Sequence, residues 1–365
     1  MVLFDILYIG QSGLFASQTG VRTTSENVAN VNTPGYSRRE AVFRTSRYAG
    51  RSGLRVGMGV NVETTRRILD SALVGRARDQ NSVAVSSENR ANVLARANII
   101  FGDLEGGGAS AAMDEFFASL DGLAGAPQDN NARTNVIATG ERLVETLNTY
   151  GREVRLLRQE ISTEVTARVA EVNRIGQTIT DLNRRIAQDG QASNDLLDQR
   201  DQFIGELAEL VGIDVNIQGD GVGTGTMTIT MEGGHPLISG TTFNAIEAVN
   251  TGDFVDIRAS AGGISLNLTD DIRRGAIGGL LRARDDDLGA TAAEVDQFVF
   301  DFVAEFNMRH SAGFGLDGVG GRDFFAAPGG VDDAAENLSL DLALTADTLA
   351  AATDPALVPG DNRNA

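Results

Sequence analysis

Residues 3–31 carry a single stripe of apolar and small residues, spaced alternately by four and three positions. This heptad spacing is typical of a helix that packs lengthwise on another helix. Gly10, Gly13 and Gly20 each lower helix propensity by about 1 kcal/mol relative to Ala, so we expect the helix to need a partner. A helix buried in its own domain is the alternative. The stripe consists of Leu3, Leu7, Gly10, Leu14, Ser17, Val21, Thr24, Val28 and Val31.

A distinctive turn follows in the stretch ANVNTPGYSRR, residues 29–39. Proline disfavours helical geometry in the residue before it, which is Thr33. Pro34 and Gly35 fit the two central positions of a type II turn that Tyr36 closes. The helix is therefore predicted to end near residues 31–32, where an asparagine in left-handed geometry suits a helix end.

The segment from residue 36 to 67 is basic, with eight arginines against Glu40 and Glu63. Alternating Val56, Val60 and Val62 predict short extended pieces. This segment is either a solvated loop with a hairpin or a docking surface for an acidic neighbour. We hypothesise that Tyr36 packs in an interface and that Arg38 and Arg39 meet acidic residues of neighbouring subunits.

Helical periodicity returns over most of the remaining chain and changes to period two in one region. Val215 and Ile217 begin that region, a predicted small antiparallel β unit at residues 213–269. The 57 residues from 133 to 189 span about 85 Å as a helix, which indicates a rod-like domain. We therefore expect a mainly α fold with a small antiparallel β part (α+β), built as an elongated antiparallel helical bundle. The predicted helices are 68–101, 111–123, 133–189, 195–211 and 276–310.

Charge is distributed unevenly along the 365 residues, whose net charge is −19. Residues 1–100 hold 13 Arg against 7 acidic residues, while residues 101–365 hold 18 Arg against 43. The acidic bulk disfavours nucleic-acid binding, and no apolar run is long enough to predict a membrane span. The first ten residues lack a basic segment, so export would use no cleaved signal peptide.

Candidate chemistry is sparse. The chain has no Cys and no Lys, which removes thiol catalysis and a phosphate-loop lysine. GDGVGTG, residues 219–225, lies between strand-like pieces and is predicted to be a hairpin loop. His235 and His310 show no zinc spacing, and Arg284–Asp287 lacks a calcium-loop pattern. We expect no cofactor, no metal and no enzymatic activity.

Several motifs resemble a known family. ANVNTPGYSRR is similar to the N-terminal signature of bacterial flagellar axial proteins, the rod, hook and hook-associated proteins. Four further stretches resemble, in order, the hook-associated proteins of the first hook–filament junction. They are NDLLDQRDQ (194–202), GGLLRARDDDLG (278–289), FNMRHSAGFGLDGVGGRDFF (306–325) and PGDNRNA (359–365).

The resemblance implies a structural subunit of the flagellum that forms the junction layer between hook and filament and is needed for filament assembly. It implies export by the type III route with the help of a chaperone, and an extracellular location. The implied partners are further copies of the chain in a ring or helical polymer, hook protein and the second junction protein. The inner-core helix is expected to be disordered in the monomer. Its interface residues would be Leu3, Leu7, Leu14, Val21, Val28 and Val31, and its motif turn Asn30, Asn32, Thr33, Pro34, Gly35, Tyr36 and Arg38.

The implied domain order begins with an inner-core polymerisation helix at 1–35 and a basic linker or hairpin at 36–67. Two departures from the family pattern are expected: a missing or vestigial outer domain after GRDFF, and truncation before the C-terminal helices. The remaining expected regions are a long-helix bundle at 68–212, a small β unit at 213–269, a helical return at 270–325 and an acidic tail at 326–365.

Two alternative functions remain. One is a type III-secreted adhesin or effector with a helical stalk, and the other is a peptidoglycan-cleaving enzyme.

Overall fold

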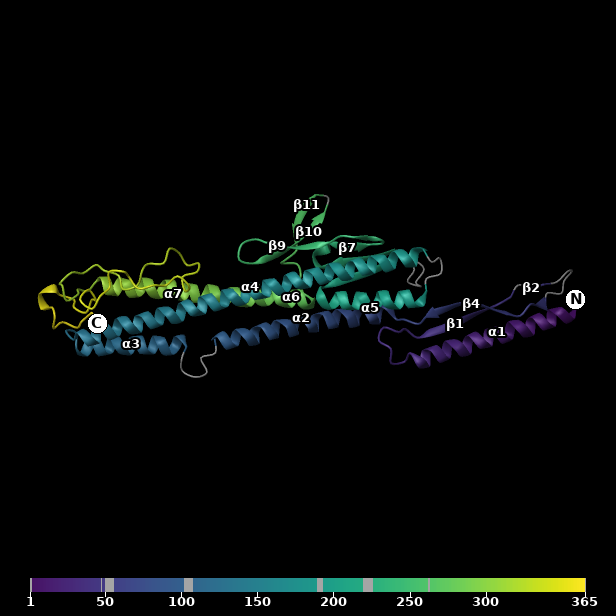
Figure 1. Cartoon of the computed structure of the whole chain (residues 1–365), viewed down its shortest axis with the longest axis horizontal. Coiled ribbons are helices and arrows are strands. Elements are labelled where there is room, and N and C mark those ends of the chain that lie inside the picture. Colours follow the sequence, from purple (N-terminus) through teal and green to yellow (C-terminus); the bar gives the residue numbers. More distant parts are fainter. Residues whose placement is uncertain are drawn as a thin grey trace. The chain divides into compact units, whose positions relative to one another are not determined.

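A computed structural model describes residues 2–46, 48–49, 56–101, 108–188, 193–218, 226–261 and 263–364. The chain divides into two compact units. Unit 1 comprises residues 1–87, 165–251 and 255–279, and unit 2 comprises residues 88–164, 252–254 and 280–365. Helices α2, α4 and α6, labelled in Figure 1, therefore contribute residues to both units.

The helices lie close to their predicted positions. The longest is α4, whose observed bounds differ from the predicted 133–189 by at most three residues. The α-helices of the described residues are α1 (Val2–Ala29), α2 (Ser71–Phe101), α3 (Ala109–Gly125), α4 (Asn130–Gln188), α5 (Asn194–Leu210), α6 (Gly275–Arg282) and α7 (Leu288–Ser311).

The single helix predicted at 276–310 is interrupted. Residues Ala283–Asp287 form a π-helical turn between α6 and α7. Charged side chains hold this turn: Arg90 forms a two-pronged ion pair with Asp287, with both N···O distances 2.7 Å. A π turn adds one residue to the helical repeat, which the apolar periodicity of the sequence does not reveal.

In the described part of the chain, the strands form four small antiparallel sheets. Strands β1 (Arg39–Thr45) and β4 (Val60–Arg67) form a two-stranded ribbon, with Arg39 opposite Arg67. The predicted β unit is two sheets, ordered β5-β6-β7-β8 and β11-β10-β9. The remaining bounds are β2 (Tyr48–Ala49), β3 (Val56–Gly57), β5 (Ile213–Gln218), β6 (Thr226–Met231), β7 (Pro236–Ser239), β8 (Thr242–Phe243), β9 (Ile246–Asn250), β10 (Val255–Ala261) and β11 (Ile264–Asn267).

The prediction of a mainly α fold with a small antiparallel β part is confirmed. Strands β7, β8 and β9 were not predicted individually, because they are short and β7 begins at Pro236, directly after a glycine-containing stretch. The predicted loop at 219–225 lies outside the described residues. The structure forms α1 within a single chain, and its expected disorder in the monomer stays a prediction.

Unit 2 has an aromatic core that anchors its irregular C-terminal segment. Phe324 and Phe325 are fully buried, with ring centroids 4.7 Å apart. Phe324 also lies 5.1 Å from Phe306 of α7 and 5.5 Å from Phe116 of α3. Residues 312–364 contain turns and one short 3₁₀ helix, Pro355–Leu357, so this core, rather than regular secondary structure, positions them.

Candidate functional site

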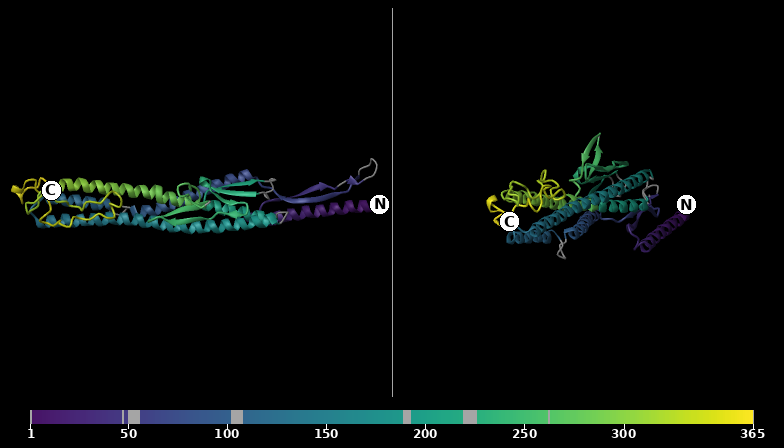
Figure 2. Two further views of the ribbon diagram at one scale, coloured as in Figure 1. Left: turned by 90° about the horizontal axis from the view of Figure 1, so that it is seen from above. Right: turned by 60° about the vertical axis from the view of Figure 1, so that its left-hand side comes forward.

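Helix α1 lies along the ribbon of β1 and β4 (Figures 1 and 2). Its ribbon side is made of small and polar residues, including Ala16 and Thr23, which are 6% and 5% exposed. Gly59 of the hairpin comes so close that a Cβ there would overlap Ser12, whose Oγ accepts the Val60 N–H at 3.2 Å. The ribbon thus covers one face of α1 with little apolar burial.

The predicted heptad stripe lies away from the ribbon and is uncovered. The exposed fractions of its large side chains are 69% for Leu7, 60% for Leu14, 67% for Val21 and 69% for Val28. The alternative of a helix buried in its own domain is therefore wrong. Val31 is 74% exposed but lies beyond the helix end, and the side chain of Leu3 lies outside the described residues.

The turn after α1 has the predicted type and position, but the helix before it ends earlier than predicted. The helix ends at Ala29 rather than near residues 31–32. The Tyr36 N–H donates to the Thr33 carbonyl at 3.2 Å, and Gly35 has φ +79°, as a type II turn requires. The expected left-handed asparagine is wrong, since among the described residues Asp333 is the sole non-glycine with positive φ. Instead, Asn30 Nδ2 donates to the Glu26 carbonyl at 3.0 Å.

Asn27 fastens the end of α1 to the start of β1. Its Oδ1 accepts from the Arg39 N–H and from the Tyr36 hydroxyl, both at 2.9 Å. Its Nδ2 donates to the Arg39 carbonyl at 2.8 Å. Burial raises the pKa of Tyr36 above its ordinary value, although the nearby Arg39 guanidinium opposes the shift. One asparagine thus satisfies both backbone groups of Arg39 in the way that a neighbouring strand would.

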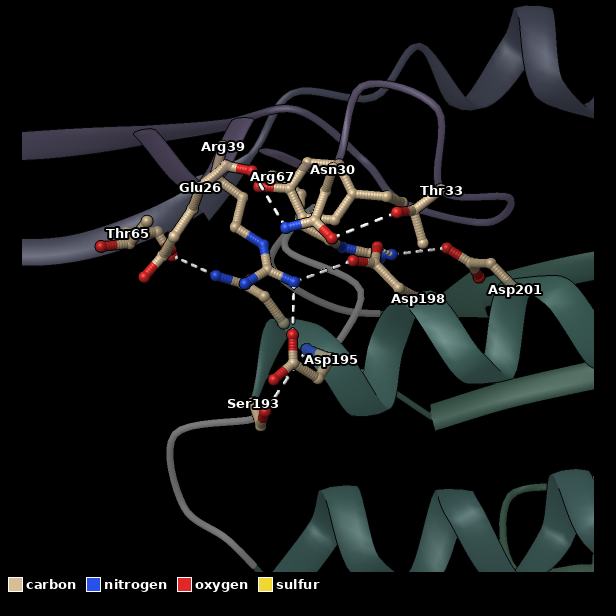
Figure 3. A network of polar contacts seen from close by, with 12 residues as sticks. Glu26, Asn30, Thr33, Arg39, Thr65, Arg67, Ser193, Asp195, Asp198 and Asp201 are labelled. Carbon is tan, nitrogen blue, oxygen red and sulfur yellow. Dashed lines mark hydrogen bonds and ion pairs between the residues drawn. The ribbon is translucent and has the colours of Figure 1, made fainter. Parts of the chain in front are cut away.

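Two arginines of the ribbon meet three aspartates of α5 (Figure 3). Arg39 Nη2 pairs with Asp195 Oδ1 and, at 3.0 Å, with Asp198 Oδ2. Arg67 Nη1 lies 3.0 Å from Asp198 Oδ1 and 2.7 Å from Asp201 Oδ2. The side chains of Arg39, Arg67 and Asp198 are only 12%, 8% and 10% exposed. Asp198 therefore bridges both guanidinium groups in a partly desolvated setting, where charge pairs are stronger than at an open surface.

The start of α5 holds these acids in place. Ser193 is its N-cap and accepts from the Asp195 N–H at 3.3 Å. Carboxylates in a first turn also interact favourably with the helix dipole. Asn194 Nδ2 adds a hydrogen bond to the Thr65 carbonyl of β4 at 2.7 Å. We call the contacts of Arg39, Arg67, Asn194, Asp195, Asp198 and Asp201 the ionic joint.

In the single chain, Arg39 pairs with acids of its own α5, and the hypothesis that it meets acids of a neighbouring subunit stays a prediction. Tyr36 likewise contacts its own chain, with the Arg39 guanidinium 4.9 Å from the centre of its ring. Arg38 is exposed, and its carbonyl accepts the Ile68 N–H at 2.8 Å. Asn32 and Pro34 are exposed and contribute to the turn through their backbone.

Sequence reasoning missed several members of the site. Asn27 precedes the motif turn and carries no spacing signal. Asp195, Asp198 and Asp201 recur every three residues within NDLLDQRDQ, which places them near one face of a helix. This spacing of the aspartates, together with the excess of arginine in residues 36–67, could have predicted the ionic joint from the sequence.

A second motif cluster lies in unit 2, within FNMRHSAGFGLDGVGGRDFF. Asn307 Oδ1 accepts the N–H groups of Phe324 and Phe325, both at 3.0 Å, and its Nδ2 donates to the Phe325 carbonyl at 2.7 Å. His310 Nδ1 lies 2.8 Å from the Arg322 carbonyl, and its Nε2 accepts the Ala350 N–H at 3.0 Å. These two side chains position backbone, which explains the motif without catalysis.

The described residues hold no group of three or more His, Asp or Glu side chains arranged to bind a metal ion. Among the same residues, no helix is both long and apolar enough to cross a bilayer.

Comparison with known proteins gives a consistent family. Residues 94–325 match the family model of the flagellar hook-associated protein FlgK helical domain, and residues 7–36 match that of flagella basal body rod proteins. Flagellar hook-associated protein 1 of Salmonella typhimurium is 30% identical over 328 residues, 86% of this chain and 58% of the relative. The Bacillus subtilis protein of the same name is 25% identical over 362 residues, 90% and 71% of the two chains.

The solved structure of the flagellar hook junction protein FlgK from Burkholderia pseudomallei superposes with a TM-score of 0.62. Its sequence identity is 26%, and the match covers 70% of this chain and 46% of that one. The chain thus spans about 58% of the length of the first curated relatives it matches. Because the helical-domain model alone covers more than half of the chain, the chain belongs to the family of flagellar hook-associated proteins that contain the FlgK helical domain.

Proposed function

We propose that the chain is a structural subunit of the bacterial flagellum, which forms the junction layer between hook and filament and is needed for filament assembly. The names of its relatives support this role. The observation that carries it is the uncovered stripe on α1. Four large apolar side chains at heptad spacing, each at least 60% exposed, form a surface that a partner helix would bury.

In this proposal, residues 1–35 are the polymerisation segment of the inner core, and the rest of the chain lies around that core. The chain is exported by the type III route with a chaperone and functions outside the cell. Its partners are further copies of itself, hook protein and the second junction protein. The matches all point to flagellar axial proteins, so the adhesin alternative has no support.

The test is a paired substitution of stripe residues in the producing bacterium. Leu7→Asp with Leu14→Asp should place charge in the helix–helix contact and abolish filaments, while the variant is still exported. The control is Leu342→Asp with Leu357→Asp, which puts the same charge at residues that are 104% and 53% exposed in unit 2. Electron microscopy of filaments reads the result. Normal filaments on the α1 variant would overturn the proposal.

A further inference from the structure

The N-terminal arm, residues 2–67, has a single covalent connection to the rest of unit 1. That connection is the short segment 68–70 between β4 and α2. Ile68 and Leu69 in it are 39% and 44% exposed. A rotation of a few backbone angles there would move the arm as a body without unfolding α2 or the ribbon.

The described contacts between the arm and α5 are polar. They are the two-arginine, three-aspartate network and the bond from Asn194 to the Thr65 carbonyl. Gly35 adds a close approach, since a Cβ built on it lies 3.6 Å from the Cβ of Gln202. The large apolar residues of α1 face solvent instead. The joint thus depends on charge, which salt screens, more than on apolar burial.

The acidic half of the joint is formed independently of the arm. Asp195, Asp198 and Asp201 lie on the first turns of α5, which Ser193 caps and Leu197 anchors as a buried residue. The basic half is equally preformed, because Arg39 and Arg67 are directly paired positions of one ribbon. Either half would therefore keep its geometry if the arm moved away.

We propose that the arm is exchanged between copies, so that Arg39 and Arg67 of one copy bind Asp195, Asp198 and Asp201 of a second copy. This inference rests on the proposed function, in which copies assemble side by side. The occupant is a second copy because its α5 offers the same three carboxylates at the same spacing, so the charge complementarity seen within one chain is reproduced between two. Exchange of an identical element is a low-cost route to assembly, and head-to-tail exchange links copies into a closed ring or an open helix.

The test uses the absence of native cysteine. Gly35→Cys reports the arm and Gln202→Cys reports α5, and their built Cβ separation suits a disulfide. The double variant should form an intramolecular disulfide. A mixture of the two purified single variants, with different tags, should form a disulfide-linked pair of unlike chains roughly tenfold more than the control mixture, because docking raises the effective thiol concentration.

The matched control replaces Gln202→Cys by Leu342→Cys, at an exposed residue of unit 2 that is not part of the joint. High salt should lower the cross-linked yield of the test mixture towards this control, since the joint is ionic. The exchange proposal would be overturned by one combination of results. The double variant would form its intramolecular disulfide, but the mixture of single variants would give no more disulfide-linked pairs than the control mixture. That result would not affect the proposed junction role. Conversely, Leu7→Asp with Leu14→Asp would leave the cross-link intact even where filaments fail.

A second test avoids the strain of a side chain at Gly35, whose φ is +79°. One variant reverses the arm charge (Arg39→Asp, Arg67→Asp) and the other reverses α5 (Asp195→Arg, Asp198→Arg, Asp201→Arg). Neither can close its own joint, but each complements the other. Mixing should produce a heterodimer in sedimentation, whereas either alone should stay monomeric. A mixture that stays monomeric would contradict the proposal.

Discussion

Two asparagines perform the same task in different surroundings. Asn27 in the arm and Asn307 in unit 2 each accept from two donors and donate to one carbonyl, so that a single amide holds a stretch of backbone. The bonds of Asn307 are buried, and those of Asn27 are partly open to solvent. The hydrogen-bond geometry is therefore alike, while the apolar burial around it differs.

This difference distinguishes a segment that is complete from one that awaits a partner. The C-terminal segment of unit 2 is irregular, yet it is fixed by buried aromatic rings and by Arg133, whose guanidinium donates to the Pro127 and Leu349 carbonyls, both at 2.7 Å. The arm has regular secondary structure, but its large apolar residues are exposed and its attachment is ionic. Regular secondary structure is thus a poor guide to which region is self-sufficient.

The largest expected effect comes from removing aromatic burial. Phe324→Ala should destabilise unit 2 by about 3–5 kcal/mol, because it opens a cavity among packed rings. The arm counterpart is Phe15→Ala, where the ring is 58% exposed and the expected loss is about 0.5 kcal/mol or less. Urea unfolding followed by hydrogen exchange of unit 2 and arm amides measures both. Equal losses would break the comparison.

The asparagine pair sharpens the comparison further. Asn307→Ala leaves the N–H groups of Phe324 and Phe325 and the Phe325 carbonyl without their hydrogen-bond partner in a buried site. We expect this to lower the free energy of unfolding by about 3 kcal/mol. Asn27→Ala removes the same number of bonds where water can replace them, so we expect about 1 kcal/mol. Hydrogen exchange at Phe325 and Arg39 reads each site locally. A larger loss at Asn27 would show that the arm is more tightly closed than its exposure indicates.

The sequence was sufficient for the parts of the fold that repeat. Apolar periodicity located α4 within a few residues, and proline and glycine chemistry gave the turn at Thr33–Tyr36. The motif resemblance gave the family, which the comparisons show. These successes share a cause: each rests on neighbours in sequence, whose geometry local rules determine.

The rest depends on residues that are distant in sequence. Arg67 and Asp201 are 134 positions apart, and nothing local in either indicates the other. The π turn at Ala283–Asp287 and the clamps of Asn27 and Asn307 are similarly set by tertiary packing. The sequence did not identify the acids that Arg39 meets for this reason, because charge alone indicates a type of partner and not which copy supplies it.

The smallest expected effect concerns pH and again separates the two regions. Burial lowers the pKa of His310 below its ordinary value. This outweighs the hydrogen bond to the Arg322 carbonyl and the charges of Asp323 and Asp341, which raise the pKa, while the Arg322 charge lowers it further. Burial lowers the pKa of His235 too. Below the ordinary histidine pKa, the unfolded chain therefore binds more protons than the folded chain. The free energy of unfolding is highest above that pKa and falls as the pH drops below it.

Protonation would also remove the acceptor that His310 Nε2 offers to the Ala350 N–H. We therefore expect the urea midpoint of unit 2 to fall between about pH 7 and pH 5, and His310→Gln to flatten that fall. His235→Gln is the matched control in unit 1. The arm has no histidine, so hydrogen exchange at Arg39 should not change over the same range. An arm that opened as readily as unit 2 would mean that the two regions unfold together, and the contrast drawn from their contacts would then not extend to their energetics.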